Sequence, residues 1–173
     1  MTQHRLTRRN FPIALTSLLS ASGLAPSVAA FRPGPEEGGE ISRTAEAIHQ
    51  EVVLKANRKR VYEALNDADQ FRRISKGAET KISREPGGAF SLFGKAIAGR
   101  QLELIPGERI VQAWRANGWA PGDYSIARFE LKEQGSDTKI VFDHTGFPKG
   151  QAEHLADGWK QHYWGPLAEY FAS

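Results

Sequence analysis

The chain has 173 residues, of which 40% are hydrophobic and 25% are charged, a balance typical of one globular domain and not of a disordered chain. It contains no cysteine, so disulfides, thiolate metal sites and cysteine nucleophiles are excluded. The net charge of +3 arises in the first thirty residues, which hold three arginines and no acidic residue. The rest of the chain has 20 basic and 20 acidic residues and is therefore neutral overall. That remainder has no basic stripe for phosphates and no apolar run of roughly eighteen residues, so we expect neither nucleic-acid binding nor stable membrane insertion.

Residues 1–30 have the composition of an export signal. A positively charged start ends in Arg8-Arg9, and a mildly apolar stretch follows from Pro12 to Ala25. Small residues then allow cleavage after Ala29 or Ala30. The paired arginines, with an aromatic residue two positions on, match the twin-arginine pattern, so we expect a periplasmic or secreted protein exported by that pathway. A general secretory signal that happens to hold two adjacent arginines is the alternative.

The sequence changes character twice after the signal. Residues 31–44 are rich in Pro, Gly and Glu and lack periodicity, which predicts a flexible leader before a domain at 45–173. Apolar residues then alternate over 48–54, which indicates a half-buried strand. Two short helices are expected next, with Asn57 and Asp67 as their N-caps.

A series of strands joined by tight turns makes up the middle of the domain. Turns rich in Gly and Pro separate five segments of strand character, at residues 89–93, 97–105, 109–115, 124–131 and 138–145. Alternation in the last two puts on one face Ser125, Ala127, Phe129, Leu131, Ile140, Phe142 and His144. These spacings predict an antiparallel meander with one buried face.

A long helix is expected from Lys149 to Phe171. Its apolar stripe comprises Leu155, Trp159, His162, Pro166 and Tyr170. At α-helical spacing Trp164 falls on the far side from this stripe, and Pro166 should bend the helix near its end. The elements together predict an α+β fold of two layers, with a long helix across a bent sheet and a cavity between them.

The order of these elements, together with several short motifs, resembles a known family. The motifs are Asn57–Tyr62, Pro86–Gly88, the strand from Gly99 to Pro106, Arg109–Trp114, Thr138–Phe147 and Gly158–Leu167. From about Ala47 to Phe171 the chain resembles bacterial members of the START-like (SRPBCC) branch named for activators of the heat-shock-protein-90 ATPase. The resemblance implies a helix-grip, Bet v-like fold: a curved antiparallel sheet of about six or seven strands, two short helices and a long C-terminal helix. It also implies a cavity for an apolar or amphipathic small molecule, but no single activity.

The expected cavity lies between the sheet and the C-terminal helix. The side chains expected to line it are Phe90, Leu92, Leu102, Trp114, Phe129, Phe142, His144, Trp159, His162 and Tyr163. Aromatic rings dominate this set and could stack on a flat apolar ligand. A filled aromatic core without a ligand is the alternative.

Histidines are the only obvious catalytic material. His144 is the candidate general acid–base, and a core histidine hydrogen-bonded to backbone or to Thr145 is the alternative. Asp143 should point to the opposite face of its strand, so the two do not form a pair. His154 and His162 are eight residues apart, roughly 12 Å along a helix, and cannot share a metal ion. No metal or other cofactor is expected.

Three hypotheses of function follow. The first is an exported domain that binds a small hydrophobic molecule in the cavity. The second is an enzyme of the cyclase or hydratase kind with an inward histidine as acid–base. The third is a protein-interaction module, which ranks last because activation of the chaperone requires a cytosolic partner and ATP.

Overall fold

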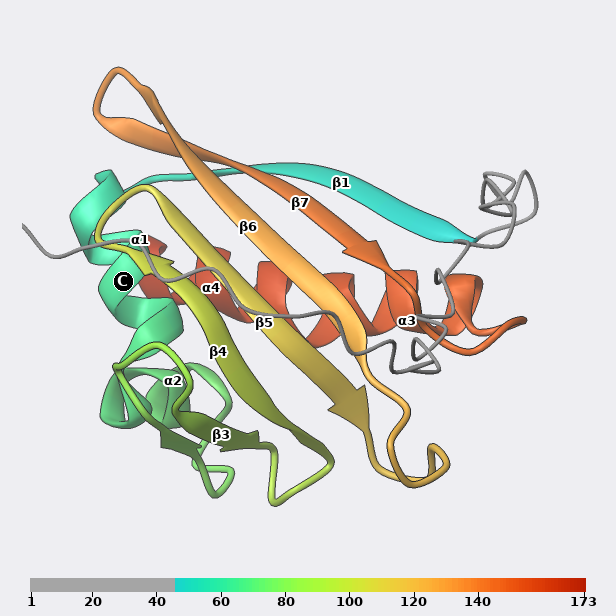
Figure 1. Ribbon diagram of the computed structural model, residues 1–173. Coiled ribbons are helices and arrows are strands. Elements are labelled where there is room, and N and C mark those ends of the chain that lie inside the picture. The colour runs from blue at the N-terminus through green and yellow to red at the C-terminus, as the bar shows by residue number, and fades with distance from the viewer. Residues whose placement is uncertain (1–45) are drawn as a thin grey trace, which may run out of the picture. The chain divides into compact units, whose positions relative to one another are not determined.

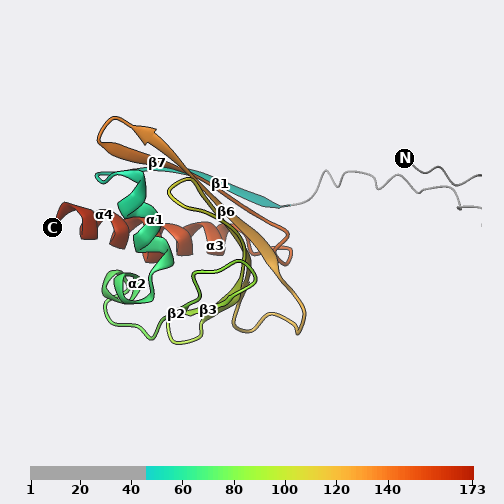
Figure 2. The ribbon, with the colours of Figure 1, turned by 60° about the vertical axis from the view of Figure 1, so that its left-hand side comes forward.

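The computed structural model describes residues 46–173; the predicted signal at 1–30 and leader at 31–44 lie outside the described residues. The domain is a curved seven-stranded sheet with all its helices on one side (Figures 1 and 2). The strands are β1 (Ala47–Leu54), β2 (Lys81–Ile82), β3 (Ala89–Leu92), β4 (Ile97–Ile105), β5 (Arg109–Ala116), β6 (Ser125–Gln134) and β7 (Asp137–Thr145). The helices are α1 (Arg58–Asn66), α2 (Ala68–Ile74), α3 (Ala152–Trp159), η1 (Lys160–Trp164) and α4 (Gly165–Ala172).

Every neighbouring pair of strands is antiparallel, in the order β1-β7-β6-β5-β4-β3-β2. Strands β2 to β7 form a meander, and β1 pairs with β7 to become the edge strand on that side of the sheet. The predicted α+β helix-grip fold is therefore confirmed. The last three helical segments form one continuous helix that crosses the sheet behind β4 to β7 (Figure 1).

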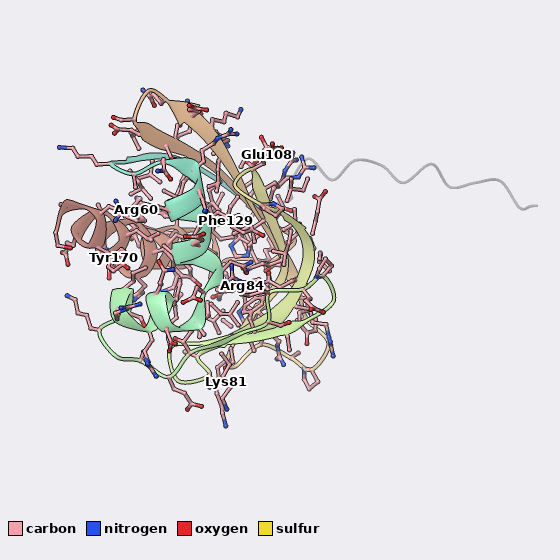
Figure 3. All side chains as sticks on the ribbon, turned by 90° about the vertical axis from the view of Figure 1, so that its left-hand side faces the viewer. Arg60, Lys81, Arg84, Glu108, Phe129 and Tyr170 are labelled. Atoms are coloured by element: carbon pink, nitrogen blue, oxygen red, sulfur yellow. The ribbon has the colours of Figure 1, made fainter. Side chains whose placement is uncertain are left out.

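Alternation along β6 and β7 builds the core. Phe129 lies directly opposite Phe142 in the strand register, and their ring centroids are 4.9 Å apart. Figure 3 shows Phe129 in the layer of side chains between the sheet and the helices. Ala127 lies opposite His144 in the same layer, and both are fully buried. The predicted inward face of these strands is confirmed.

The two short helices begin where their capping residues predict. The Oδ1 of Asn57 accepts a hydrogen bond of 3.0 Å from the backbone N–H of Arg60. The Oδ1 of Asp67 accepts one of 2.9 Å from the backbone N–H of Gln70. Each bond satisfies a donor that a helix start leaves free, which fixes the first turn of α1 and α2.

Leu102 does not line the cavity, contrary to the sequence prediction. Its side chain is 49% exposed, because it follows the fully buried Gln101 and so points to the opposite face of β4. Gln101 pairs with Gln112 and Glu103 with Val111, so Leu102 has no partner on β5. This irregularity is a β-bulge that inserts one residue, so Leu104 packs on the core although Leu102, two residues before it, faces outward.

The predicted stripe of the C-terminal helix is wrong in its second half. Residues 160–164 form a π-helical turn, in which the N–H of Gly165 donates to the carbonyl of Lys160. The buried residues are Leu155, Trp159, Tyr163, Trp164, Leu167 and Phe171. His162 is exposed, whereas Trp164, predicted on the far side, stacks on Trp159 at 5.8 Å with 21° between the rings. The π-turn explains both corrections, because it brings residues five apart onto one face.

Candidate functional site

The domain contains a cavity of about 410 Å³ between the β4–β5 end of the sheet and the C-terminal helix. The residues around it are Phe93, Ala96, Ile97, Trp114, Ala116, Asn117, His154, Leu155, Gly158, Trp159, His162 and Tyr163. The sheet side is provided by β4 and β5 and by the turn between β3 and β4. The opposite side is provided by α3 and η1. The cavity thus lies where the sequence predicts a gap between the two layers.

The lining is largely apolar and lacks formal charge. Of the twelve lining residues, all in the described part of the chain, none is Asp, Glu, Lys or Arg. Trp114 and Trp159 are buried and form the inner end. Asn117, His154 and His162 are exposed, so they mark where the cavity meets solvent. This arrangement suits a molecule with an apolar body.

Phe93 forms part of the wall in an uncommon backbone conformation. Its φ is +53°, in the left-handed region that non-glycine residues rarely adopt. Its ring packs against Phe71 and Tyr163, each with centroids 5.5 Å away, and lies 6.0 Å from His162. These contacts hold the aromatic ring over the cavity despite the cost of the backbone conformation.

His144 is a fully buried side chain with a partner at each ring nitrogen. The indole Nε1 of Trp159 donates to its Nδ1 at 3.0 Å, so the proton of the neutral ring is on Nε2. That Nε2 donates to the Oγ of Ser125 at 2.7 Å. The hydroxyl of Ser125 in turn donates to the backbone carbonyl of Trp114 at 2.9 Å. This chain of bonds joins β5, β6, β7 and α3.

The electrostatics of His144 agree with this geometry. Burial lowers the pKa of His144 to about 4, because the charged imidazolium loses its hydration. The ring is therefore neutral near pH 7, as a donor–acceptor chain requires. Asp143 points to the opposite face, as predicted, and its Oδ1 lies 2.7 Å from the Nδ1 of His49.

Two buried polar atoms of the cavity wall lack a partner. They are the indole Nε1 of Trp114 and the phenol oxygen of Tyr163, neither of which has a hydrogen bond to any described residue. Burial raises the pKa of the Tyr163 phenol, and the neighbouring Trp114 side chain acts in the opposite direction. The indole of Trp114 influences the phenol because it lies close to it. The indole nitrogen and the phenol oxygen nevertheless do not meet the geometry of a hydrogen bond.

Comparison with known proteins identifies the family. The family model for "Activator of Hsp90 ATPase homolog 1-like protein" matches residues 55–172. The chain belongs to this family. It is therefore an AHSA1-like domain, and its helix-grip architecture is the one expected of its structural neighbours.

Individual relatives are more distant. The chain is 34% identical over 85 residues to an activator of 90 kDa heat shock protein ATPase homolog from Dictyostelium discoideum. The match covers 49% of this chain and 22% of that relative. The crystal structure of an HSP90 activator from Plasmodium falciparum matches with a TM-score of 0.70 and 24% identity, over 73% of this chain and 96% of that chain. CalU16 from Micromonospora echinospora matches with a TM-score of 0.62 and 24% identity, over 75% of this chain and 77% of that chain. The chain thus spans about a quarter of the length of the curated relatives it matches.

The AHSA1-like domain brings only part of the predicted lining set together. Trp114, Trp159, His162 and Tyr163 surround the cavity. Phe90, Leu92 and Phe129 instead border, with Tyr163, a second void of only about 10 Å³, too small for an organic molecule. Phe142 and His144 are buried with no exposed surface and lie outside the cavity lining.

Sequence reasoning missed the remaining lining residues of the AHSA1-like domain: Phe93, Ala96, Ile97, Ala116, Asn117, His154, Leu155 and Gly158. A sequence signal existed for Gly158, because an isolated glycine inside a helical pattern costs stability and so draws attention to its position. No such signal existed for Phe93, whose contribution depends on its φ. In the described residues no group of three His, Cys, Asp or Glu side chains could hold a metal ion. Within the same residues no helix has the length and apolar character needed to span a membrane.

Proposed function

We propose that this AHSA1-like domain binds a small, largely apolar molecule in the cavity between the sheet and the C-terminal helix. The cavity itself carries the proposal. Its volume of about 410 Å³ falls in the range of ligand sites, roughly 300–1,000 Å³. It is bounded by aromatic rings from both layers, which offer a large contact area for an apolar molecule.

A role for His144 in acid–base catalysis lacks support from its geometry. Both ring nitrogens already have partners, and the side chain has no exposed surface. A general base must reach the proton that it removes, and His144 is outside the cavity lining. His162 does lie at the mouth of the cavity but is exposed to solvent. The binding hypothesis therefore ranks above the enzyme hypothesis.

Gly158 provides a test of the binding site. It lies in α3 and lines the cavity, and a Cβ at this position would meet no atom within 4 Å. Gly158→Leu should therefore extend its side chain into the cavity, and the helix should gain about 1 kcal/mol in propensity. We expect its affinity for the neutral fluorescent probe N-phenyl-1-naphthylamine to fall at least tenfold, measured by the rise in probe fluorescence on titration.

Gly158→Ala is the matched control for this change. It adds one methyl group, so it should keep probe affinity within about threefold of the parent while gaining similar helix propensity. Equal probe affinity in all three proteins would contradict the assignment of the cavity as the binding site.

We further propose that the domain is exported by the twin-arginine pathway. The proposal rests on Arg8-Arg9 and the mildly apolar segment after them, and on the charge balance of the remaining chain. An exported domain would have no access to a cytosolic chaperone or its ATP. The heat-shock-protein activity in the names of its relatives is therefore not proposed for this chain.

Arg8→Lys with Arg9→Lys tests the route of export. The paired lysines keep the charge of the signal but remove the arginine pair that the pathway reads. We expect the parent in the periplasmic fraction and the variant in the cytoplasmic fraction, measured by immunoblotting after cell fractionation. Export of both would indicate the general secretory route, and a cytoplasmic parent would contradict export and restore the interaction hypothesis.

A further inference from the structure

The partnerless polar atoms in the cavity wall indicate what kind of ligand the cavity takes. We propose that it selects a neutral carbonyl compound, whose oxygen accepts hydrogen bonds from the hydroxyl of Tyr163 and the indole N–H of Trp114. This inference rests on the proposed function, because it specifies the ligand of the same cavity.

Both groups are donors in need of an acceptor. The indole Nε1 of Trp114 can only donate, and its side chain is 3% exposed. The hydroxyl of Tyr163 is also buried, in a side chain that is 5% exposed. The raised pKa of the Tyr163 phenol keeps its proton in place, so the group remains a donor throughout the physiological range. Buried polar groups nearly always have a partner, so two unpartnered ones side by side require an explanation.

The two donors lie close together but belong to different layers of the fold. Trp114 belongs to β5 and Tyr163 to the π-turn η1, which widens the helix at this point. A π-turn inside an α-helix is rare and is found frequently at functional sites. An acceptor between the two residues would bond to the sheet and to the helix together.

Tyr163 lies between two spaces in the core. Its ring borders both the cavity and the second void of about 10 Å³. Neither donor atom has exposed surface, so a ligand oxygen reaches them only when side chains of the wall move on binding. Both rings are closely packed: Trp114 lies 5.5 and 5.6 Å from Trp119 and Trp159, and Tyr163 lies 4.2 Å from Trp159, between centroids.

The charge of the lining distinguishes a carbonyl from a carboxylate. None of the lining residues carries a formal charge of either sign, apart from the two histidines at the mouth, which are positively charged only when protonated. A carboxylate at the inner end of the cavity would be buried without a counter-charge, which is strongly unfavourable. A ketone, quinone or ester oxygen accepts the same bonds without that penalty.

Three probes of nearly the same shape test the proposal on the full chain. They are 2-acetylnaphthalene, which has a ketone; 2-isopropenylnaphthalene, in which a CH₂ group replaces the oxygen; and 2-naphthoate, which is anionic at pH 7.5. We expect the ketone to bind about tenfold more tightly than the alkene and more tightly than the carboxylate, measured by equilibrium dialysis. Two moderate hydrogen bonds suffice for a tenfold preference.

Variants that remove one donor each identify the groups responsible. Tyr163→Phe and Trp114→Phe should each lower the preference for ketone over alkene to about threefold, and the double variant should abolish it. The phenol oxygen of Tyr163 and the indole Nε1 of Trp114 have no partner in the described residues, so neither variant removes an existing hydrogen bond. Tyr170→Phe is the matched control, because Tyr170 lies on α4 and does not line the cavity, and it should keep the full preference.

The outcomes separate this inference from the proposed function. Equal binding of ketone and alkene by the parent would overturn the inference but leave the cavity as a site, with a water molecule serving the two donors. Tightest binding of 2-naphthoate would overturn it in favour of an anionic ligand. Binding of none of the three probes would contradict the proposed function itself, and this inference with it.

Discussion

Trp159→Ala is expected to lower the free energy of unfolding by about 5 kcal/mol, a large part of the roughly 5–15 kcal/mol typical of a domain. The side chain is 2% exposed and packs against aromatic rings from both layers. Those rings belong to Trp114, Phe129, Phe142, His144, Tyr163 and Trp164. The change would leave a large void and would also remove the donor to Nδ1 of His144, which adds the cost of a buried unpaired acceptor. Urea denaturation followed by circular dichroism measures the effect.

Two companion variants divide this loss into its parts. Trp159→Phe keeps most of the ring but not the N–H, so it should cost about half as much. Trp119→Ala removes a tryptophan that is only partly buried in a loop, and it should cost about 1 kcal/mol. If Trp159→Ala cost no more than Trp119→Ala, the central packing role assigned to Trp159 would be wrong.

Acid should destabilise the domain through His144. Above about pH 6.5 the histidine is neutral in both the folded and the unfolded chain and makes no pH-dependent contribution. Between that pH and about 4 the unfolded chain binds a proton that the folded protein excludes, so stability falls as the pH falls. The loss reaches about 3 kcal/mol and levels off below the folded pKa, because both states are then protonated. Urea unfolding at a series of pH values from 7.5 to 3.5 measures it.

His144→Gln provides the comparison, since it removes the titration at this position. The variant should be less stable than the parent at pH 7.5 because it breaks the chain of bonds to Trp159 and Ser125. The difference between the two proteins should shrink as the pH falls. Direct titration of the His144 ring by NMR offers a second measurement, and a midpoint near 6.5 would contradict the buried neutral state.

Much of the fold could be predicted because it depends on local patterns. Alternation in β6 and β7 identified the buried face that holds Phe129, Phe142 and His144. Asn57 and Asp67 were recognisable as caps because their side chains bond to backbone N–H groups within the next turn. Such interactions act between residues close in sequence, so a single chain is sufficient to reveal them.

The errors occur where the backbone departs from a regular period. One extra residue in β4 puts Leu102 and Leu104 on different faces, and His162 and Trp164 exchange sides because of one π-turn. Neither irregularity has a reliable residue signature. Two-residue and 3.6-residue periods therefore gave the wrong face beyond each of these points.

The cavity was the least predictable part of the site. Its position between the layers followed from the fold, but its wall depends on residues far apart in sequence, such as Phe93 and Leu155. The partner of each ring nitrogen of His144 was also unforeseen, since Trp159 and Ser125 belong to other elements. Tertiary packing decides these contacts, and no pattern along one segment contains them.

The π-turn at residues 160–164 also affects how this domain is aligned with its relatives. A π-turn is equivalent to an α-helix into which one residue has been inserted, so the residues after it are displaced by one position along the chain. A relative with an unbroken α-helix here would present its equivalents of Leu167 and Phe171 one residue earlier. An alignment that superimposes the buried residues therefore needs a one-residue gap within this helix, a place where gaps are normally penalised.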